Sequence, residues 1–187
     1  MFKYLALVTL VLAVGMILAR VIILRSKSIQ AVKFGDTDKR DFLLMPFALL
    51  YFYLVLSHAV HWPTLGRMLF TSAVAGGIGV VLAVSGLTMV LMALIAFGTS
   101  FRVGIDEEHP GPLVTSGIFA VSRNPIYTGM AFVVTGIFFM VPDWILLLYV
   151  LGGYVVFHRQ VRLEEASLRH IYGTAYEDYC RRVRRYL

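Results

Sequence analysis

The residues of this 187-residue chain that are best suited to chemistry gather in two short segments. Arg123 and Asn124 stand together just before a proline, and Glu164 and Glu165 stand together further along the chain. A guanidinium binds a carboxylate through a bidentate fork, and a carboxylate can hold an ammonium group or orient an arginine. Both segments therefore carry side chains that could bind the charged groups of a ligand.

Each of these side chains also has a purely structural interpretation. An arginine at the end of an apolar stretch commonly extends its charged head toward water, and Arg123 stands in such a place. Glu164 and Glu165 would equally suit the dipole at the start of a helix. No metal site is expected, because the five histidines show no metal-binding spacing. The single cysteine, Cys180, excludes a disulfide within the chain.

Longer motifs surround both segments. The first motif comprises Leu113-Val114, Gly117, Phe119 and the run Arg123-Asn124-Pro125-Ile126-Tyr127-Thr128-Gly129. The second motif comprises Glu164-Glu165, Leu168, Tyr172-Gly173, Tyr176 and Tyr179. Their order and separation resemble the two signatures of the isoprenylcysteine carboxyl methyltransferase and phospholipid methyltransferase group. The resemblance covers residues 111–187.

The resemblance implies a methyltransferase that uses S-adenosyl-L-methionine. It implies catalytic roles for Arg123, Asn124 and Glu165, although histidine is common in the family at the position of Asn124. It implies cofactor binding by a larger set, in which the apolar members would wall an adenine pocket. That set is His109, Leu113, Val114, Gly117, Phe119, Arg123, Asn124, Pro125, Tyr127, Glu164 and Glu165.

The methyl acceptor implied by the resemblance is a lipophilic molecule that arrives from the bilayer. It could be an isoprenylated cysteine carboxylate, a phospholipid amine or an isoprenoid-like small molecule, and the sequence leaves these three open. Methyl transfer from an activated donor depends mainly on positioning and on exclusion of water. A carboxylate acceptor needs no general base, which suits Asn124 because an amide does not titrate near neutral pH.

The elements that would position these motifs are apolar helices. Hydrophobic residues make up 59% of the chain and charged residues only 15%. The hydrophobic residues form stretches whose lengths are close to the roughly 20 residues needed to cross a bilayer. We expect an all-α integral membrane protein with about five spans, at residues 4–24, 42–62, 69–97, 127–141 and 144–157. Pro142 and Asp143 would turn the last two spans into a helical hairpin. If that hairpin is re-entrant, the number of spans falls to four.

The part of the chain beyond residue 158 is polar and predicts an amphipathic cytoplasmic tail helix. Tyr172, Tyr176, Tyr179 and Val183 recur at spacings of four, three and four, which is typical of one helix face. We expect one structural unit overall, with N-terminal spans in residues 1–97 and a methyltransferase-like core in residues 98–187.

Basic residues predict the orientation of the spans. Fourteen of them lie in the first connection, the long third connection and the tail, whereas only Lys3 and Arg67 lie on the opposite side. The positive-inside rule then places the N-terminus outside and the C-terminus and catalytic loop in the cytoplasm, as in a bacterial inner membrane. The net charge of +6 is explained by contacts with membrane lipids, and no nucleic-acid-binding motif is present.

Two other functions remain open at this stage. A membrane reductase of the sterol-reductase type would use NADPH and would want extra basic residues near the long connection, where Arg102 is the one spare candidate. A non-enzymatic membrane scaffold would keep the motifs without using a cofactor. The glycines of the third span fit helix packing within one chain or between chains, so the oligomeric state stays open.

Overall fold

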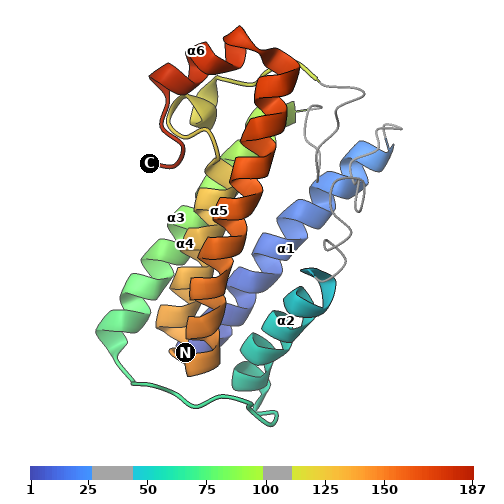
Figure 1. The fold of residues 1–187 in the computed structure, drawn as a ribbon. Helices are drawn as coiled ribbons and strands as arrows, with labels where there is room; N and C mark the ends of the chain where they lie inside the picture. Colours follow the sequence, from blue (N-terminus) through green and yellow to red (C-terminus); the bar gives the residue numbers. More distant parts are fainter. Residues whose placement is uncertain (27–43, 99–110) are drawn as a thin grey trace.

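The computed structural model describes residues 1–26, 44–98 and 111–187, and these form a bundle of long helices with a short helix across one end (Figure 1). Successive long helices run in alternating directions (Figure 1). The N-terminus lies at one end of the bundle, and the short helix lies across the opposite end. The elements are α1 (Phe2–Ser26), α2 (Leu44–Val60), α3 (Ala73–Phe97), the short 3-10 helix η3 (Gly117–Ala120), α4 (Pro125–Met140), α5 (Trp144–Tyr172) and α6 (Thr174–Arg182).

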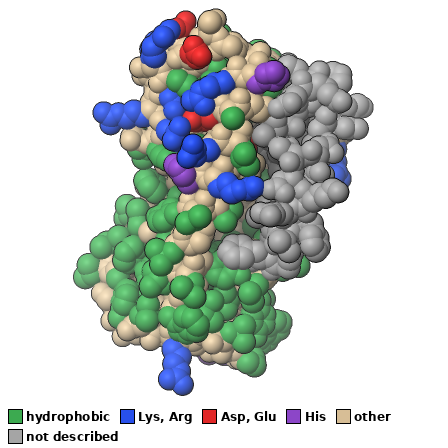
Figure 2. All heavy atoms as spheres, viewed as in Figure 1, with side chains coloured by type: hydrophobic (Ala, Val, Ile, Leu, Met, Phe, Trp, Pro, Cys, Tyr) green, Lys and Arg blue, Asp and Glu red, His purple; other side chains and the backbone are tan. Residues whose placement is uncertain are grey.

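The exterior of the bundle is apolar over most of its length. The helices α1, α3 and α5 are each long and apolar enough to cross a membrane, and α2 and α4 are shorter apolar helices. Large hydrophobic side chains face outward, including Val74, Ile95 and Val155 at 75%, 69% and 71% exposure. Charged side chains instead gather around the end that carries α6 (Figure 2). Such a surface suits lipid, which confirms the all-α integral membrane fold expected from the sequence.

The α4–α5 connection lies at the end of the bundle opposite α6. Asp143 is fully buried there, and its Oδ1 accepts a hydrogen bond from the backbone of Ile145 at 2.8 Å, which caps α5. Its other carboxylate oxygen, Oδ2, lies 3.2 Å from Nε2 of His58 on α2. The backbone N–H of Leu69 donates to Pro142 at 2.7 Å. The predicted helical hairpin is therefore present, and its turn is held by polar contacts.

The helix α5 is longer than the expected span of residues 144–157, because the polar residues that follow continue it without a break to Tyr172. It ends at Gly173, whose φ of 51° and ψ of −126° belong to a region that L side chains rarely adopt. The prediction of one helix face from Tyr172 to Val183 is wrong for this reason. Tyr172 belongs to α5, Val183 is extended, and only Tyr176 and Tyr179 share the buried face of α6.

Close packing of α3 against α4 sets the position of the first motif. A Cβ atom added to Gly86 would lie 2.5 Å from the backbone oxygen of Gly129, and one added to Gly136 would lie 2.6 Å from that of Gly79. The two helices therefore approach so closely that only glycine fits at these four crossing positions. The sequence had left open whether such glycines pack within or between chains, and these four pack within the chain.

Candidate functional site

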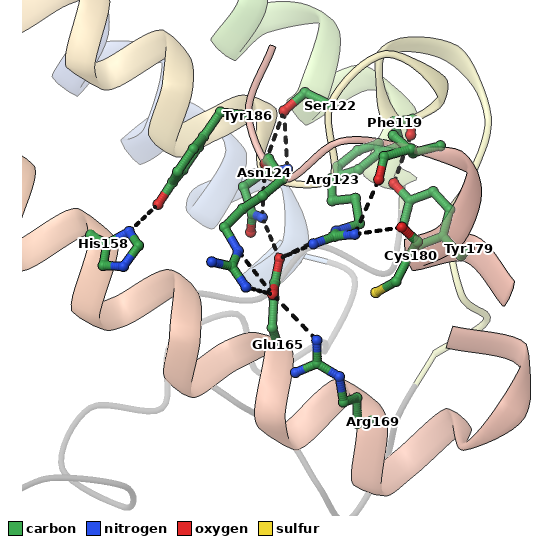
Figure 3. Close-up of polar contacts among 12 residues, drawn as sticks. Phe119, Ser122, Arg123, Asn124, His158, Glu165, Arg169, Tyr179, Cys180 and Tyr186 are labelled. Atoms are coloured by element: carbon green, nitrogen blue, oxygen red, sulfur yellow. Dashed lines mark hydrogen bonds and ion pairs between the residues drawn. The ribbon is translucent and has the colours of Figure 1, made fainter. Parts of the chain in front are cut away.

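The center of the candidate site is Glu165, a carboxylate with no solvent exposure on α5. An ionised side chain at such a position is stable only when it is paired and hydrogen-bonded. Its partners come from the turn before α4, from α5 itself and from the segment that follows α6 (Figure 3). We call this group the Glu165 cluster, and it consists of Arg123, Asn124, Glu165, Arg169 and Arg185.

Arg123 links the cluster to the end of α6. Its Nε and Nη2 donate to Oε1 of Glu165 at 3.3 and 3.1 Å. Its Nη1 donates to the backbone carbonyls of Cys180 and Val183 at 2.9 and 3.1 Å. The guanidinium therefore satisfies carbonyls at the C-terminal end of α6, which are left without helical partners, while it neutralises the buried carboxylate.

Asn124 joins the same two parts of the chain. Its side-chain amide donates to Oε1 of Glu165 and to the backbone carbonyl of Arg185, both at 3.1 Å. The residue is buried and immediately precedes α4, where Pro125 occupies the first helical turn. Both hydrogens of the amide are thereby used, so Asn124 acts here as a donor without any need to titrate.

The other carboxylate oxygen of Glu165 faces two more arginines. Arg185 donates from Nε and Nη2 to Oε2 at 3.1 and 2.9 Å. Arg169 lies one helical turn after Glu165, with its Nη2 3.7 Å from the same oxygen. Three arginines thus surround one carboxylate, so the cluster keeps a positive charge and stays close to water through the partly exposed Arg169.

The segment after α6 is aligned with the turn before α4 by backbone contacts. The N–H of Arg123 donates to the carbonyl of Arg184 at 2.9 Å, and Ser122 pairs with Arg184 as in a parallel strand. The phenol of Tyr179 donates to the carbonyl of Phe119 at 2.6 Å. Burial raises the pKa of Tyr179 to about 12, so its O–H remains a donor at neutral pH. These contacts fix α6 across the end of the bundle.

A second polar group lies on the neighbouring face of α5. The phenol of Tyr127 donates to Oε1 of Glu164, and the amide of Gln160 donates to the same oxygen at 3.4 Å. The ring of Tyr127 also packs against Phe157, with 6.0 Å between the ring centroids. A carboxylate beside an aromatic ring is an arrangement that favours a bound cation. Glu164 and Glu165 therefore serve different groups, and both lie inside α5 rather than at its start.

The remaining predicted residues lie around these two groups. Leu113 and Val114 are half-buried in the segment before η3, and Gly117 is exposed at its start with a φ of 62°. Phe119 is buried, and its ring packs on that of Phe97 with 4.6 Å between the centroids. His109 and Arg102 fall outside the described residues.

The structure adds participants that the sequence analysis missed. Arg185 belonged to a run of basic residues interpreted only as a signal of orientation, and Arg169 was counted in the same way. The spacing of four between Glu165 and Arg169 is a usable signal for a helical ion pair. No comparable pattern identifies Arg185, because its contact with Glu165 depends on how the chain turns back after α6.

Comparisons with known proteins agree with the motifs. The sequence profile described as phospholipid methyltransferase matches residues 74–175, which is more than half of the chain. The chain is 30% identical over 127 residues to protein-S-isoprenylcysteine O-methyltransferase of Rattus norvegicus, a match that covers 66% of this chain and 43% of the relative. It is 28% identical over 151 residues to a probable protein-S-isoprenylcysteine O-methyltransferase of Oryza sativa subsp. indica, covering 78% and 74%.

The chain thus spans less than half the length of the rat relative. The family profile covers the first motif and residues 164–173 of the second. The match to the human protein-S-isoprenylcysteine O-methyltransferase is similar, at 29% identity over 127 residues with 66% of this chain and 43% of the relative covered. The profile match and the buried contact that joins the two motifs through Glu165 lead to one conclusion: the chain belongs to the phospholipid methyltransferase family.

Proposed function

We propose that the protein transfers a methyl group from S-adenosyl-L-methionine to a lipophilic acceptor. The observation that carries this proposal is the joining of the two family motifs, through Arg123 and Glu165, at the polar end of an apolar bundle. A site in this place can receive a water-soluble cofactor from one side and a lipid-soluble acceptor from the other. The substrates of the named relatives, which are isoprenylated cysteines, fit the same division.

The residues beside the cluster fit the proposed cofactor. S-adenosyl-L-methionine carries two positive groups, a sulfonium and an ammonium, and supplies an electrophilic methyl group when bound. Glu164 offers a half-buried carboxylate, and Tyr127 offers an aromatic ring beside it that packs against the ring of Phe157. A carboxylate and aromatic faces both attract cations, and both attract them more strongly away from bulk water. Glu164 and Tyr127 are therefore the residues proposed to hold the charged part of the cofactor.

The Glu165 cluster is proposed to position the site. Arg123 already donates hydrogen bonds to Glu165 and to two backbone carbonyls. Both hydrogens of the Asn124 side-chain amide are also used. Their contacts hold α6 and the segment after it against the start of α4, which keeps Tyr127 beside Glu164 and limits the entry of water. Positioning and exclusion of water are what methyl transfer needs, because the donor is already activated.

The acceptor and the orientation belong to the same proposal. A carboxylate acceptor, as on an isoprenylcysteine, would attack without a general base, whereas a phospholipid amine would have to arrive unprotonated. The basic residues around the α6 end favour a cytoplasmic position for the site, with the N-terminus outside, as in a bacterial inner membrane. S-adenosyl-L-methionine is present in that compartment, and the acceptor would enter from the lipid side.

The experiment that tests the cofactor assignment is calorimetry on the detergent-purified protein with S-adenosylhomocysteine and with NADPH. We expect binding of S-adenosylhomocysteine alone. S-adenosylhomocysteine keeps the ammonium but lacks the sulfonium, so Glu164→Gln should weaken its binding about tenfold, and Tyr127→Phe less. Glu177→Gln, on the exposed face of α6, is the matched control and should bind like the wild type. Binding of NADPH alone would instead place the chain among membrane reductases, and binding of neither would favour a scaffold.

A further inference from the structure

Gln160 and Tyr127 meet at one oxygen of Glu164. The side-chain amide of Gln160 donates to Oε1 at 3.4 Å, and the phenol of Tyr127 donates to the same atom. We propose that Gln160 is a positioning residue, which together with Tyr127 occupies Oε1 and leaves Oε2 to bind the ammonium group of the cofactor. This inference rests on the proposed function and extends it from a pair of residues to a single carboxylate oxygen.

The helix α5 places the relevant side chains on one face. Phe157, Gln160 and Glu164 are separated by three and four residues, which is the spacing at which side chains on a helix are neighbours. The ring of Phe157 packs against that of Tyr127, which lies in the first turn of α4. Gln160 therefore approaches Glu164 along α5, whereas Tyr127 approaches it from α4. The two donors hold the carboxylate from two directions.

The two neighbouring glutamates differ in how their oxygens are used. Both oxygens of Glu165 accept hydrogen bonds, Oε1 from Arg123 and Asn124 and Oε2 from Arg185. In the part of the chain that the structure describes, Glu164 accepts hydrogen bonds at Oε1 alone and forms no ion pair. Glu164 therefore keeps an oxygen and a negative charge available for a ligand, whereas the charge of Glu165 is already matched by arginine.

An ammonium group complements this arrangement. It offers three donors, and its hydrogen bonds to a carboxylate are about twice as strong as those between neutral groups. The ring of Tyr127 beside the carboxylate adds a further attraction for a cation. Because the amide of Gln160 is neutral, it satisfies Oε1 without cancelling the charge of Glu164. A lysine one helical turn from a glutamate would instead form an ion pair with it.

The test changes the side chain of Gln160 and measures binding by calorimetry on the detergent-purified protein. S-adenosylhomocysteine carries the ammonium group, whereas 5′-methylthioadenosine has the same nucleoside without the amino-acid end. Gln160→Lys should weaken the binding of S-adenosylhomocysteine about tenfold, because the introduced charge pairs with Glu164 in place of the ligand. Gln160→Leu removes only the donor and should weaken it about twofold. Both variants should bind 5′-methylthioadenosine like the wild type.

The matched control is Ala166→Lys, which adds the same charge at an exposed position of α5. Ala166 is two residues from Glu164, and side chains at that spacing do not face each other, so this variant should bind both compounds like the wild type. Wild-type binding of S-adenosylhomocysteine by Gln160→Lys, or an equal loss of both compounds, would overturn the positioning role. Failure of the wild type itself to bind S-adenosylhomocysteine would overturn the proposed function, and this inference with it.

Discussion

Arg185 reaches back from the segment after α6 to place its Nε and Nη2 at 3.1 and 2.9 Å from Oε2 of Glu165. This pair closes the cluster, because the other carboxylate oxygen is already bonded to Arg123 and Asn124. Arg169 approaches the same oxygen less closely, with its Nη2 at 3.7 Å from Oε2. This ion pair therefore adds a charged contact to the backbone contacts that hold the segment after α6.

Replacing Arg185 with glutamine should destabilise the protein by about 1–3 kcal/mol, since a hydrogen-bonded charge on a buried carboxylate is lost. Thermal unfolding of the detergent-solubilised protein measures the effect. Arg181→Gln is the control, because Arg181 is exposed and, among the described residues, pairs with Asp178 within α6. Such exposed pairs contribute less than about 1 kcal/mol. Equal shifts for the two variants would show that the contact with Glu165 is not stabilising.

The glycines between α3 and α4 give a second prediction. Gly86→Ala or Gly136→Ala should destabilise the bundle by about 1–3 kcal/mol, because the added methyl group would collide with the backbone of the facing helix. Gly152→Ala is the control, since nothing lies within 4 Å of a Cβ added there and alanine favours the helix. Urea-induced unfolding in mixed micelles compares them. A neutral effect of Gly86→Ala would mean that α3 and α4 can separate without loss.

At the far end of the bundle, Asp143 should matter as a helix cap. Asp143→Ala removes the acceptor for the backbone N–H of Ile145 and should cost about 0.5–2 kcal/mol. Asp143→Asn retains an oxygen that can accept the same bond, so it should keep most of the stability. Thermal unfolding distinguishes the two. If the asparagine variant falls as far as the alanine variant, the carboxylate acts through its charge near His58 instead of through the cap.

Stability should also depend on Tyr179 at high pH. Burial raises the pKa of Tyr179 from its usual value near 10 to about 12 in the folded protein. A group whose folded pKa is raised stabilises fully below its unfolded pKa, so the contribution is complete below about pH 10 and is lost as the pH rises toward 12. Tyr179→Phe should flatten the fall in melting temperature over that window. An identical pH profile in this variant would assign the alkaline transition to other groups.

The sequence by itself determined the membrane character, the all-α fold and the residues of the two motifs. Long apolar stretches must be buried in lipid, and their lengths leave few alternatives to helices that cross it. Pro142 and Asp143 marked the turn between α4 and α5 for the same reason, since neither suits the lipid interior. The motif residues Arg123, Asn124 and Glu165 could likewise be selected together before any contact was known.

Only the tertiary structure decided which side chains meet. Glu164 and Glu165 are neighbours in sequence, but the helix points one toward Tyr127 and the other toward three arginines. Periodicity extended the tail helix across Gly173, whereas the chain turns there and brings Arg185 back to Glu165. Local pattern determines helices because their hydrogen bonds are local. Contacts such as Arg123 to the carbonyl of Val183 depend on the packing of distant segments, which no spacing in the sequence records.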